Sequence, residues 1–154
     1  MKNILKAASV ALAVSVSASV AFADDAKPAA KTAALVTIAA DELKWVPNPA
    51  NPDVQMAVVW GDPAMGPHTT FHKFKAGFDA GVHSHSSDMG IAVISGTLIA
   101  GPAGGPEKKL PAGSYEFQPH GVKHTTKCDA SGPCVIFVSA SGKFDLTPAD
   151  AAKK

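Results

Sequence analysis

The stretch GFDAGVHSHSSDMG, residues 77–90, places two histidines one residue apart among glycine, serine and aspartate. In an extended strand, residues i and i+2 point to the same face, so His83 and His85 can present their imidazoles side by side. Two such side chains supply half of a four-coordinate metal site. A polar strand can also carry this pair without binding metal, so the interpretation depends on a third ligand.

The third candidate ligand is His124, which ends the stretch GSYEFQPHGVKH, residues 113–124. Pro119 and Gly121 predict a tight turn from which the chain re-enters a strand at this histidine. Met89 lies four residues after His85, where a metal site would usually have a carboxylate. Its thioether could bind a soft metal such as Cu(I), or it could fill space in the core.

The spacing of these residues resembles the first of the two sequence motifs of the cupin superfamily, G-x5-H-x-H-x3-E-x6-G. Gly77, His83, His85 and Gly96 match this motif, and Met89 stands where the motif has glutamate.

The second cupin motif, G-x5-P-x-G-x2-H-x3-N, is matched by Gly113, Pro119, Gly121 and His124, with Cys128 in place of the asparagine. The two matches lie 16 residues apart and occur together, which makes the resemblance specific over residues 77–128. The wider combination of LKWVPNPA, VVWGD and both motif segments resembles a family of small bacterial cupins catalogued as having no known function.

The resemblance implies an all-β chain folded as a cupin-type jelly-roll β-barrel, with one divalent transition metal bound by His83, His85 and His124. Imidazole suits Fe, Cu, Zn and Ni, whereas Mn prefers carboxylate oxygens, so the methionine at position 89 disfavours Mn. Three histidines also leave a coordination position open for a substrate.

Three functions fit this resemblance. Some cupin dioxygenases use three histidines without a carboxylate, which favours an Fe or Cu dioxygenase-type oxidoreductase acting on a small chelating substrate. Met89 and the scarcity of acid and base groups favour a non-catalytic periplasmic protein that binds metal or a small ligand. In the third interpretation, the barrel has lost its metal and is structural.

Other polar side chains near the motifs are candidates for the surroundings of the metal or the pocket. His72 shares a strand face with Phe74, and so it could point into the barrel near the metal. His120 lies on the turn of the second motif, where it could line the mouth of the pocket. Tyr115 is the only tyrosine, and strand parity alone assigns neither it nor Glu116 to the interior.

Cys128 and Cys134 are the only cysteines, and they close the short loop CDASGPC. In an exported protein, such a pair is typical of a disulfide, which would pin the turn after the His124 strand. A thiolate at the metal is the competing interpretation.

The first residues have the pattern of a secretory signal peptide. Lys2 and Lys6 precede an Ala/Val-rich run that ends in Ala21-Phe22-Ala23, a small-x-small cleavage pattern. We therefore predict a signal peptide over residues 1–23, a flexible lead-in over 24–33, a cupin domain over 34–154, and a periplasmic or secreted location. Serines within the apolar run and the following DD disfavour a stable membrane anchor.

The remaining chain alternates short β-type runs with Gly, Pro and Asp, which predicts an all-β sandwich or barrel. The runs are ALVTIA, VQMAVVW, TTFHKFKA, GIAVISGTLIA, SYEFQ, TTKC and CVIFVSA. The charge of the chain indicates which partners to expect. Without Lys2 and Lys6, 12 of the 14 basic residues remain against 13 acids, and none is arginine. We therefore expect a small-molecule ligand and no nucleic acid, with a homodimer as a candidate assembly because open strand edges need covering.

Overall fold

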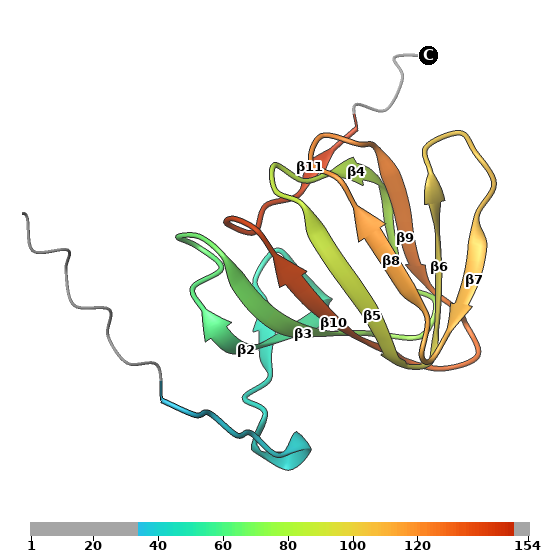
Figure 1. Ribbon diagram of the computed structural model, residues 1–154. Coiled ribbons are helices and arrows are strands. Elements are labelled where there is room, and N and C mark those ends of the chain that lie inside the picture. Colours follow the sequence, from blue (N-terminus) through green and yellow to red (C-terminus); the bar gives the residue numbers. More distant parts are fainter. Residues whose placement is uncertain (1–33, 150–154) are drawn as a thin grey trace, which may run out of the picture. The chain divides into compact units, whose positions relative to one another are not determined.

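The computed structural model describes residues 34–149, and the fold belongs to the unit that begins at Val36. The predicted signal peptide and the lead-in up to residue 33 lie outside the described residues. Residues 34–39 have no regular structure, and a short 3-10 helix, η1 (Ala40–Glu42), follows them (Figure 1). All later regular elements of the described chain are β-strands.

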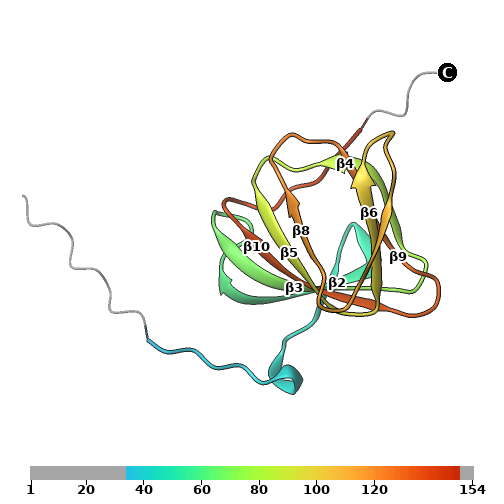
Figure 2. The same cartoon turned by 45° about the vertical axis from the view of Figure 1, so that its right-hand side comes forward.

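Two antiparallel sheets make up the fold, and they face each other as the layers of a sandwich (Figures 1 and 2). The first sheet contains, in spatial order, β1 (Val46–Asn48), β2 (Asn51–Gly61), β3 (His68–Phe74), β10 (Cys134–Ala140), β5 (Met89–Ser95) and β8 (Tyr115–Gln118). The second contains β11 (Thr147–Pro148), β4 (Asp79–Ser84), β9 (His124–Cys128), β6 (Thr97–Pro102) and β7 (Lys108–Pro111). From β3 onward the chain passes from one sheet to the other at every connection except the β6–β7 hairpin, which is the jelly-roll arrangement.

Alternation along the strands places the core between the sheets. In β3 and β10, and in β5 as far as Val93, every second residue is buried, as expected for strands with one inward face. The buried apolar side chains from both sheets form one cluster, which includes Phe74, Ile91, Leu98, Ile136 and Val138. The site described below lies in the part of this interior where histidines replace apolar residues.

The all-β jelly-roll prediction is confirmed, with a correction to its closure. Within residues 34–149, no backbone ladder joins the edges of the two sheets, so the fold is a sandwich and not a closed barrel. The predicted strand ALVTIA is wrong: residues 34–39 form no strand, and Leu35 and Val36 are 93% and 66% exposed. Strand propensity was insufficient here because a strand also needs a neighbouring ladder and a buried face.

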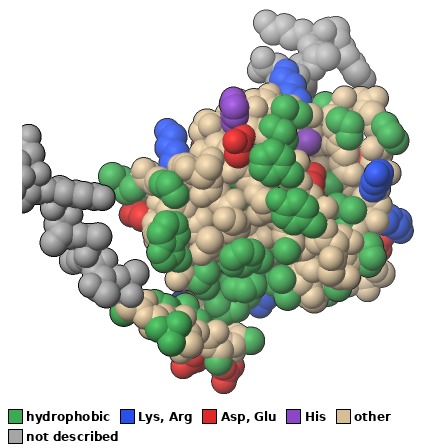
Figure 3. Space-filling view, viewed as in Figure 1, with side chains coloured by type: hydrophobic (Ala, Val, Ile, Leu, Met, Phe, Trp, Pro, Cys, Tyr) green, Lys and Arg blue, Asp and Glu red, His purple; other side chains and the backbone are tan. Residues whose placement is uncertain are grey.

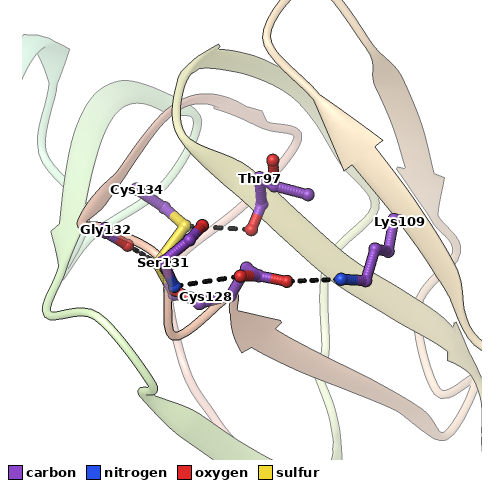
Figure 4. The surroundings of a disulfide bond; sticks show 7 residues. Thr97, Lys109, Cys128, Ser131, Gly132 and Cys134 are labelled. Carbon is purple, nitrogen blue, oxygen red and sulfur yellow. Dashed lines mark hydrogen bonds and ion pairs between the residues drawn. A yellow bond between two sulfur atoms is a disulfide. The ribbon is translucent and has the colours of Figure 1, made fainter.

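A disulfide links Cys128, the last residue of β9, to Cys134, the first residue of β10 (Figure 4). The turn between them is supported by Asp129, whose carboxylate accepts hydrogen bonds from the Ser131 backbone N–H at 3.0 Å and from Lys109 Nζ at 2.7 Å. The bond therefore joins a strand of one sheet to a strand of the other, and that first strand begins at His124.

Several apolar side chains remain on the surface, including Ile94 on β5 and Tyr115 and Phe117 on β8. Figure 3 shows apolar side chains over much of the face seen there, with most lysines towards its edges. The expected homodimer stays a prediction. No helix within residues 34–149 has the length and apolar character to cross a bilayer.

Candidate metal centre

Three buried histidines converge at one end of the second sheet. Strands β4 and β9 are antiparallel neighbours, and their register pairs His83 with His124, so both imidazoles point to the same face. Strand β4 ends at Ser84, yet the next residue, His85, keeps its ring beside that of His83, with 5.0 Å between ring centroids. Each residue offers a ring nitrogen, and these nitrogens all lie within 4.8 Å of one another.

Backbone carbonyls set the tautomer of all three imidazoles. Nδ1 of His83 lies 3.0 Å from the Gly81 carbonyl oxygen, and Nδ1 of His124 lies 2.9 Å from that of Val122. Nδ1 of His85 bonds to the Asp145 carbonyl oxygen. A carbonyl oxygen can only accept, so each Nδ1 carries the proton and each Nε2 keeps a lone pair. Three lone pairs held in this way are typical of a metal site whose ligands are oriented from behind.

The environment of His124 Nε2 tests whether a metal ion fits between the three histidines. This atom is buried and has no hydrogen-bond partner among the described residues. An unpaired buried polar atom is destabilising by about 1–3 kcal/mol, so native proteins rarely keep one without a use. A cation bound jointly by this nitrogen and those of His83 and His85 would satisfy it. The donor set therefore fits a transition metal.

The turn before His124 shows why the motif spacing matters. Gly121 adopts a φ of 72°, which a side chain would strain, and its N–H donates to the His85 carbonyl oxygen at 2.8 Å. The second motif is thereby attached to the backbone of the first. This contact places the two segments, which are distant in sequence, at a spacing that suits one ion.

Burial favours the neutral form of His83 and His85, which is the form that binds a metal. The pKa of His85 falls to about 4, mainly through burial and also through the neighbouring His83 and His124, against the raising effect of the Asp145 carbonyl. Burial also lowers the pKa of His83, with the Gly81 carbonyl opposing the shift. Near neutral pH, these imidazoles therefore offer lone pairs and not positive charge.

The segment between β10 and β11 supplies contacts that the sequence did not reveal. The Asp145 carbonyl oxygen bonds to His85, and the Asp145 side chain accepts a hydrogen bond from the Ser86 N–H at 2.8 Å. The ring of Phe144 lies 5.7 Å from that of His85, measured between centroids. Asp145 is 60 residues from His85, so neither spacing nor periodicity could have indicated the contact.

A cavity of about 640 Å³ lies between the sheets and reaches His83 and His85. Its walls are mainly apolar and include Phe74, Phe78, Met89, Ile91, Ile136, Val138, Phe144 and Leu146. Met89 is 3% exposed and belongs to the apolar core cluster, which agrees with a space-filling side chain. A cavity of this size and composition is typical of small-molecule sites.

The other predicted pocket residues lie in different environments. His72 is buried and lines the cavity from β3. Tyr115 is 65% exposed, because the strand alternation of β8 turns it away from the interior. His120 is exposed, and its backbone N–H and ring Nδ1 bond to the Asp88 carboxylate at 2.7 and 2.9 Å. Neither Tyr115 nor His120 lines the cavity.

Strand alternation in β8 turns two of its four side chains, Glu116 and Gln118, towards the interior. Glu116 and Gln118 alternate with Tyr115, and Gln118 donates to Thr126 Oγ1 at 3.4 Å across the sandwich. One carboxylate oxygen of Glu116 is buried and unpartnered among the described residues. Burial raises the pKa of Glu116, with opposing effects from Gln118 and His124. In the sequence, only the short alternation of SYEFQ indicated that Glu116 and Gln118 share a face. Which face points inward became clear only from the pairing of β8 with β5.

Comparison with known families gives one match: the family described as Domain of unknown function (DUF4437) matches residues 8–147. No curated protein matches the chain.

Several solved structures share the fold. The polyketide cyclase RemF from Streptomyces resistomycificus superposes with a TM-score of 0.63 at 15% identity, over 78% of this chain and 89% of that one. An RmlC-like cupin protein from Ralstonia eutropha superposes with a TM-score of 0.59 at 22% identity, over 70% of this chain and 68% of that one. The DMSP lyase DddQ from Ruegeria pomeroyi superposes with a TM-score of 0.60 at 15% identity, over 73% of this chain and 64% of that one. These likenesses confirm the cupin fold, in which a three-histidine cluster indicates a metal-binding site.

Proposed function

The chain belongs to the family described as Domain of unknown function (DUF4437), and on that premise we propose that it is a metal-dependent cupin acting on a small molecule. The observation that carries the proposal is the set of three Nδ1 to carbonyl hydrogen bonds, which leave the Nε2 atoms of His83, His85 and His124 to converge. His68 has the same kind of bond, from Nδ1 to the Gly66 carbonyl oxygen, and a buried Nε2 without a partner among the described residues, but it lies outside this group. The three candidate ligands differ from it because their ring nitrogens converge.

The reaction class that we propose is a dioxygenase-type oxidation. A metal held by three imidazoles has coordination positions open for a substrate and for dioxygen, and the cavity reaches two of the ligands. When bound, the metal would supply Lewis acidity and redox chemistry, while the protein excludes water and orients the substrate. We further propose Fe or Cu, with Zn or Ni next and Mn least favoured, because no carboxylate joins the three-histidine group.

Non-catalytic binding of metal or a small ligand is the second candidate. It is favoured by the scarcity of acids and bases around the site, where methionine occupies the cupin glutamate position and Glu116 does not line the cavity. The two candidates differ in turnover, not in metal content.

Metal content tests the metal binding that both candidate functions share. We expect about one equivalent of a transition metal by elemental mass spectrometry in protein purified without an affinity tag or chelator. His83→Ala and His124→Ala should each lose it, because each removes one of the converging nitrogens. His120→Ala is the matched control, since this histidine is exposed and paired with Asp88, and it should retain the metal. Absence of metal from wild-type protein, after reconstitution with Fe, Cu, Zn and Ni, would reject the proposal.

Oxygen uptake separates the two candidates. Metal-loaded wild-type protein should consume oxygen with a panel of small neutral diketones, catechols and thiols, and the uptake should vanish in His124→Ala. Stoichiometric metal without turnover or oxygen uptake across the panel favours the binding protein.

We also propose that the protein is exported and works in the periplasm or outside the cell. The Cys128–Cys134 disulfide supports this location, because such bonds persist in oxidising compartments and are rare in the cytosol. Fractionation of the expressing cells, with N-terminal sequencing of the mature chain, tests both the location and cleavage after Ala23.

A further inference from the structure

The cavity contains almost no charge. Among the residues that line it, Asp79 is the one ionisable acid or base apart from the histidines, and it lies at an exposed position. Its carboxylate is already engaged, because it accepts a hydrogen bond from the Gly81 N–H at 2.8 Å and lies 3.6 Å from Lys127 Nζ. Within residues 34–149, no lysine lines the cavity, and the chain has no arginine. An anionic ligand would therefore lose its hydration without gaining an ion pair from the wall.

Aromatic side chains form several parts of the wall. Phe74 and Phe78 stack with 4.8 Å between centroids and 5° between planes. Phe144 presents its ring between His85, at 5.7 Å, and His72, at 5.4 Å, again measured between centroids. These surfaces favour a ligand with a flat apolar body, since aromatic pairs add to simple area burial.

His72 supplies a polar group on the sheet that faces the three-histidine cluster. It projects from β3 in the first sheet, whereas His83 and His124 belong to strands of the second. Its Nε2 lies 3.0 Å from Thr70 Oγ1, in a buried hydrogen bond. Its other ring nitrogen, Nδ1, has no hydrogen-bond partner among residues 34–149, and this atom is not completely buried. The ring lines the cavity, so this nitrogen is available to a ligand.

We infer that His72 and Phe144 recognise an uncharged, mainly aromatic molecule that carries a hydroxyl or carbonyl group, and that they hold it in the cavity beside His83 and His85. His72 makes the hydrogen bond, and Phe144 contacts the flat body. The inference rests on the proposed function for what happens to the ligand afterwards, but recognition itself needs no metal. His72 is thus a positioning and specificity residue and not a metal ligand.

The test uses three probes of one shape: 2-naphthol, naphthalene and 2-naphthoate. Binding is measured by equilibrium dialysis on full-length protein stripped of metal with EDTA, because a carboxylate could otherwise bind the metal directly. We expect 2-naphthol to bind at least tenfold more tightly than 2-naphthoate. The same ranking should hold in His124→Ala, which removes a candidate metal ligand that does not line the cavity, so absence of a metal site would leave this result unchanged.

Variants assign the ranking to residues. His72→Phe should weaken 2-naphthol binding by about two- to tenfold, the range of one net hydrogen bond, and leave naphthalene binding unchanged. His72→Gln, which keeps a donor and an acceptor, should recover part of the loss. Phe144→Ala should weaken naphthalene and 2-naphthol together, by a similar factor, and it keeps the inference testable if His72→Phe does not fold.

Three outcomes would overturn the inference. The first is binding of 2-naphthoate as tight as that of 2-naphthol. The second is an equal loss of 2-naphthol and naphthalene in a folded His72→Phe variant, which would mean that the residue only shapes the wall. The third is no binding of any probe to folded wild-type protein.

Discussion

The chemistry of this protein depends on which nitrogen of each histidine carries the proton. Histidine has two ring nitrogens, and a backbone carbonyl at Nδ1 decides that Nε2 is the ligand atom. His83 and His124 obtain their carbonyls from residues two positions earlier, Gly81 and Val122, so their orientation is local. His85 obtains its carbonyl from Asp145, so its orientation depends on the folded chain.

Met89 should act as an apolar core residue and not as a sulfur ligand. We expect Met89→Leu to keep the metal stoichiometry and to change Cu(I) and Zn(II) affinity less than tenfold, because the side chain belongs to the buried cluster. Titration with a competing chelator measures the affinity. A selective loss of Cu(I) binding would instead identify the thioether as a ligand.

Burial of His72 should make stability depend on pH. Its pKa falls to about 3 from an ordinary value of 6.5, mainly through burial, with His68 and His85 adding to the shift. Between these values the unfolded chain binds a proton that the folded chain does not, so stability falls as pH falls below about 6.5. In metal-free protein, this histidine should account for about 2 kcal/mol of the loss in unfolding free energy between pH 7 and 5.

Urea unfolding at the two pH values measures that contribution. His72→Gln should show a smaller difference between pH 7 and 5 by about this amount, whatever its absolute stability. An unchanged difference would show that other groups carry the pH dependence.

Among the elements, the segment between β10 and β11 has the greatest influence on the site relative to its length. It has no regular structure, yet it contacts two successive residues of the first motif, His85 and Ser86, from a distant part of the chain. Strands β4 and β9 place His83 and His124 by register. This segment instead holds His85 by one hydrogen bond to its ring and one aromatic contact, and it holds the neighbouring Ser86 by a second hydrogen bond.

Removal of the Asp145 side chain should therefore weaken metal binding. In Asp145→Ala, the bond to the Ser86 N–H is lost while the backbone carbonyl remains, and we expect affinity to fall about tenfold. Asp62→Ala is the matched control, because Asp62 makes an equivalent bond, to the Ala64 N–H at 2.9 Å, outside the cavity lining. Equal metal affinity in both variants would show that the segment does not orient His85.

For the whole molecule, the sandwich is held together by apolar packing, a disulfide and, on the proposed function, a metal that bridges β4 and β9. Because a metal that binds only the folded state stabilises it by mass action, free metal at 100 times its dissociation constant contributes about 2.7 kcal/mol.

Metal removal should accordingly lower the melting temperature. We expect Zn²⁺ to raise the Tm of chelator-treated protein by about 5–15 °C, and EDTA to reverse the change. Differential scanning calorimetry gives the measurement, with His124→Ala expected to be insensitive to Zn²⁺ and His120→Ala to respond like wild type. A shift of the same size in His124→Ala would place the binding elsewhere.

The sequence was sufficient for the features that depend on local spacing. The period-2 pattern and the turn residues predicted the strands that became β2, β3, β5, β6, β8, β9 and β10, because alternation and turn chemistry act over a few residues. The motif spacing predicted the three histidines that cluster, and the two cysteines predicted the disulfide.

Folding in three dimensions settled what spacing could not. The failure of residues 34–39 to form a strand, the inward turn of Glu116, and the contacts of Phe144 and Asp145 with His85 all depend on which segments become neighbours. Such contacts join residues far apart in the chain, and their free energy comes from burial and register between sheets. The three candidate ligand residues were readable from the motif spacing, whereas the choice of ring nitrogen at His85 and the shape of the mainly apolar cavity required the packed sandwich.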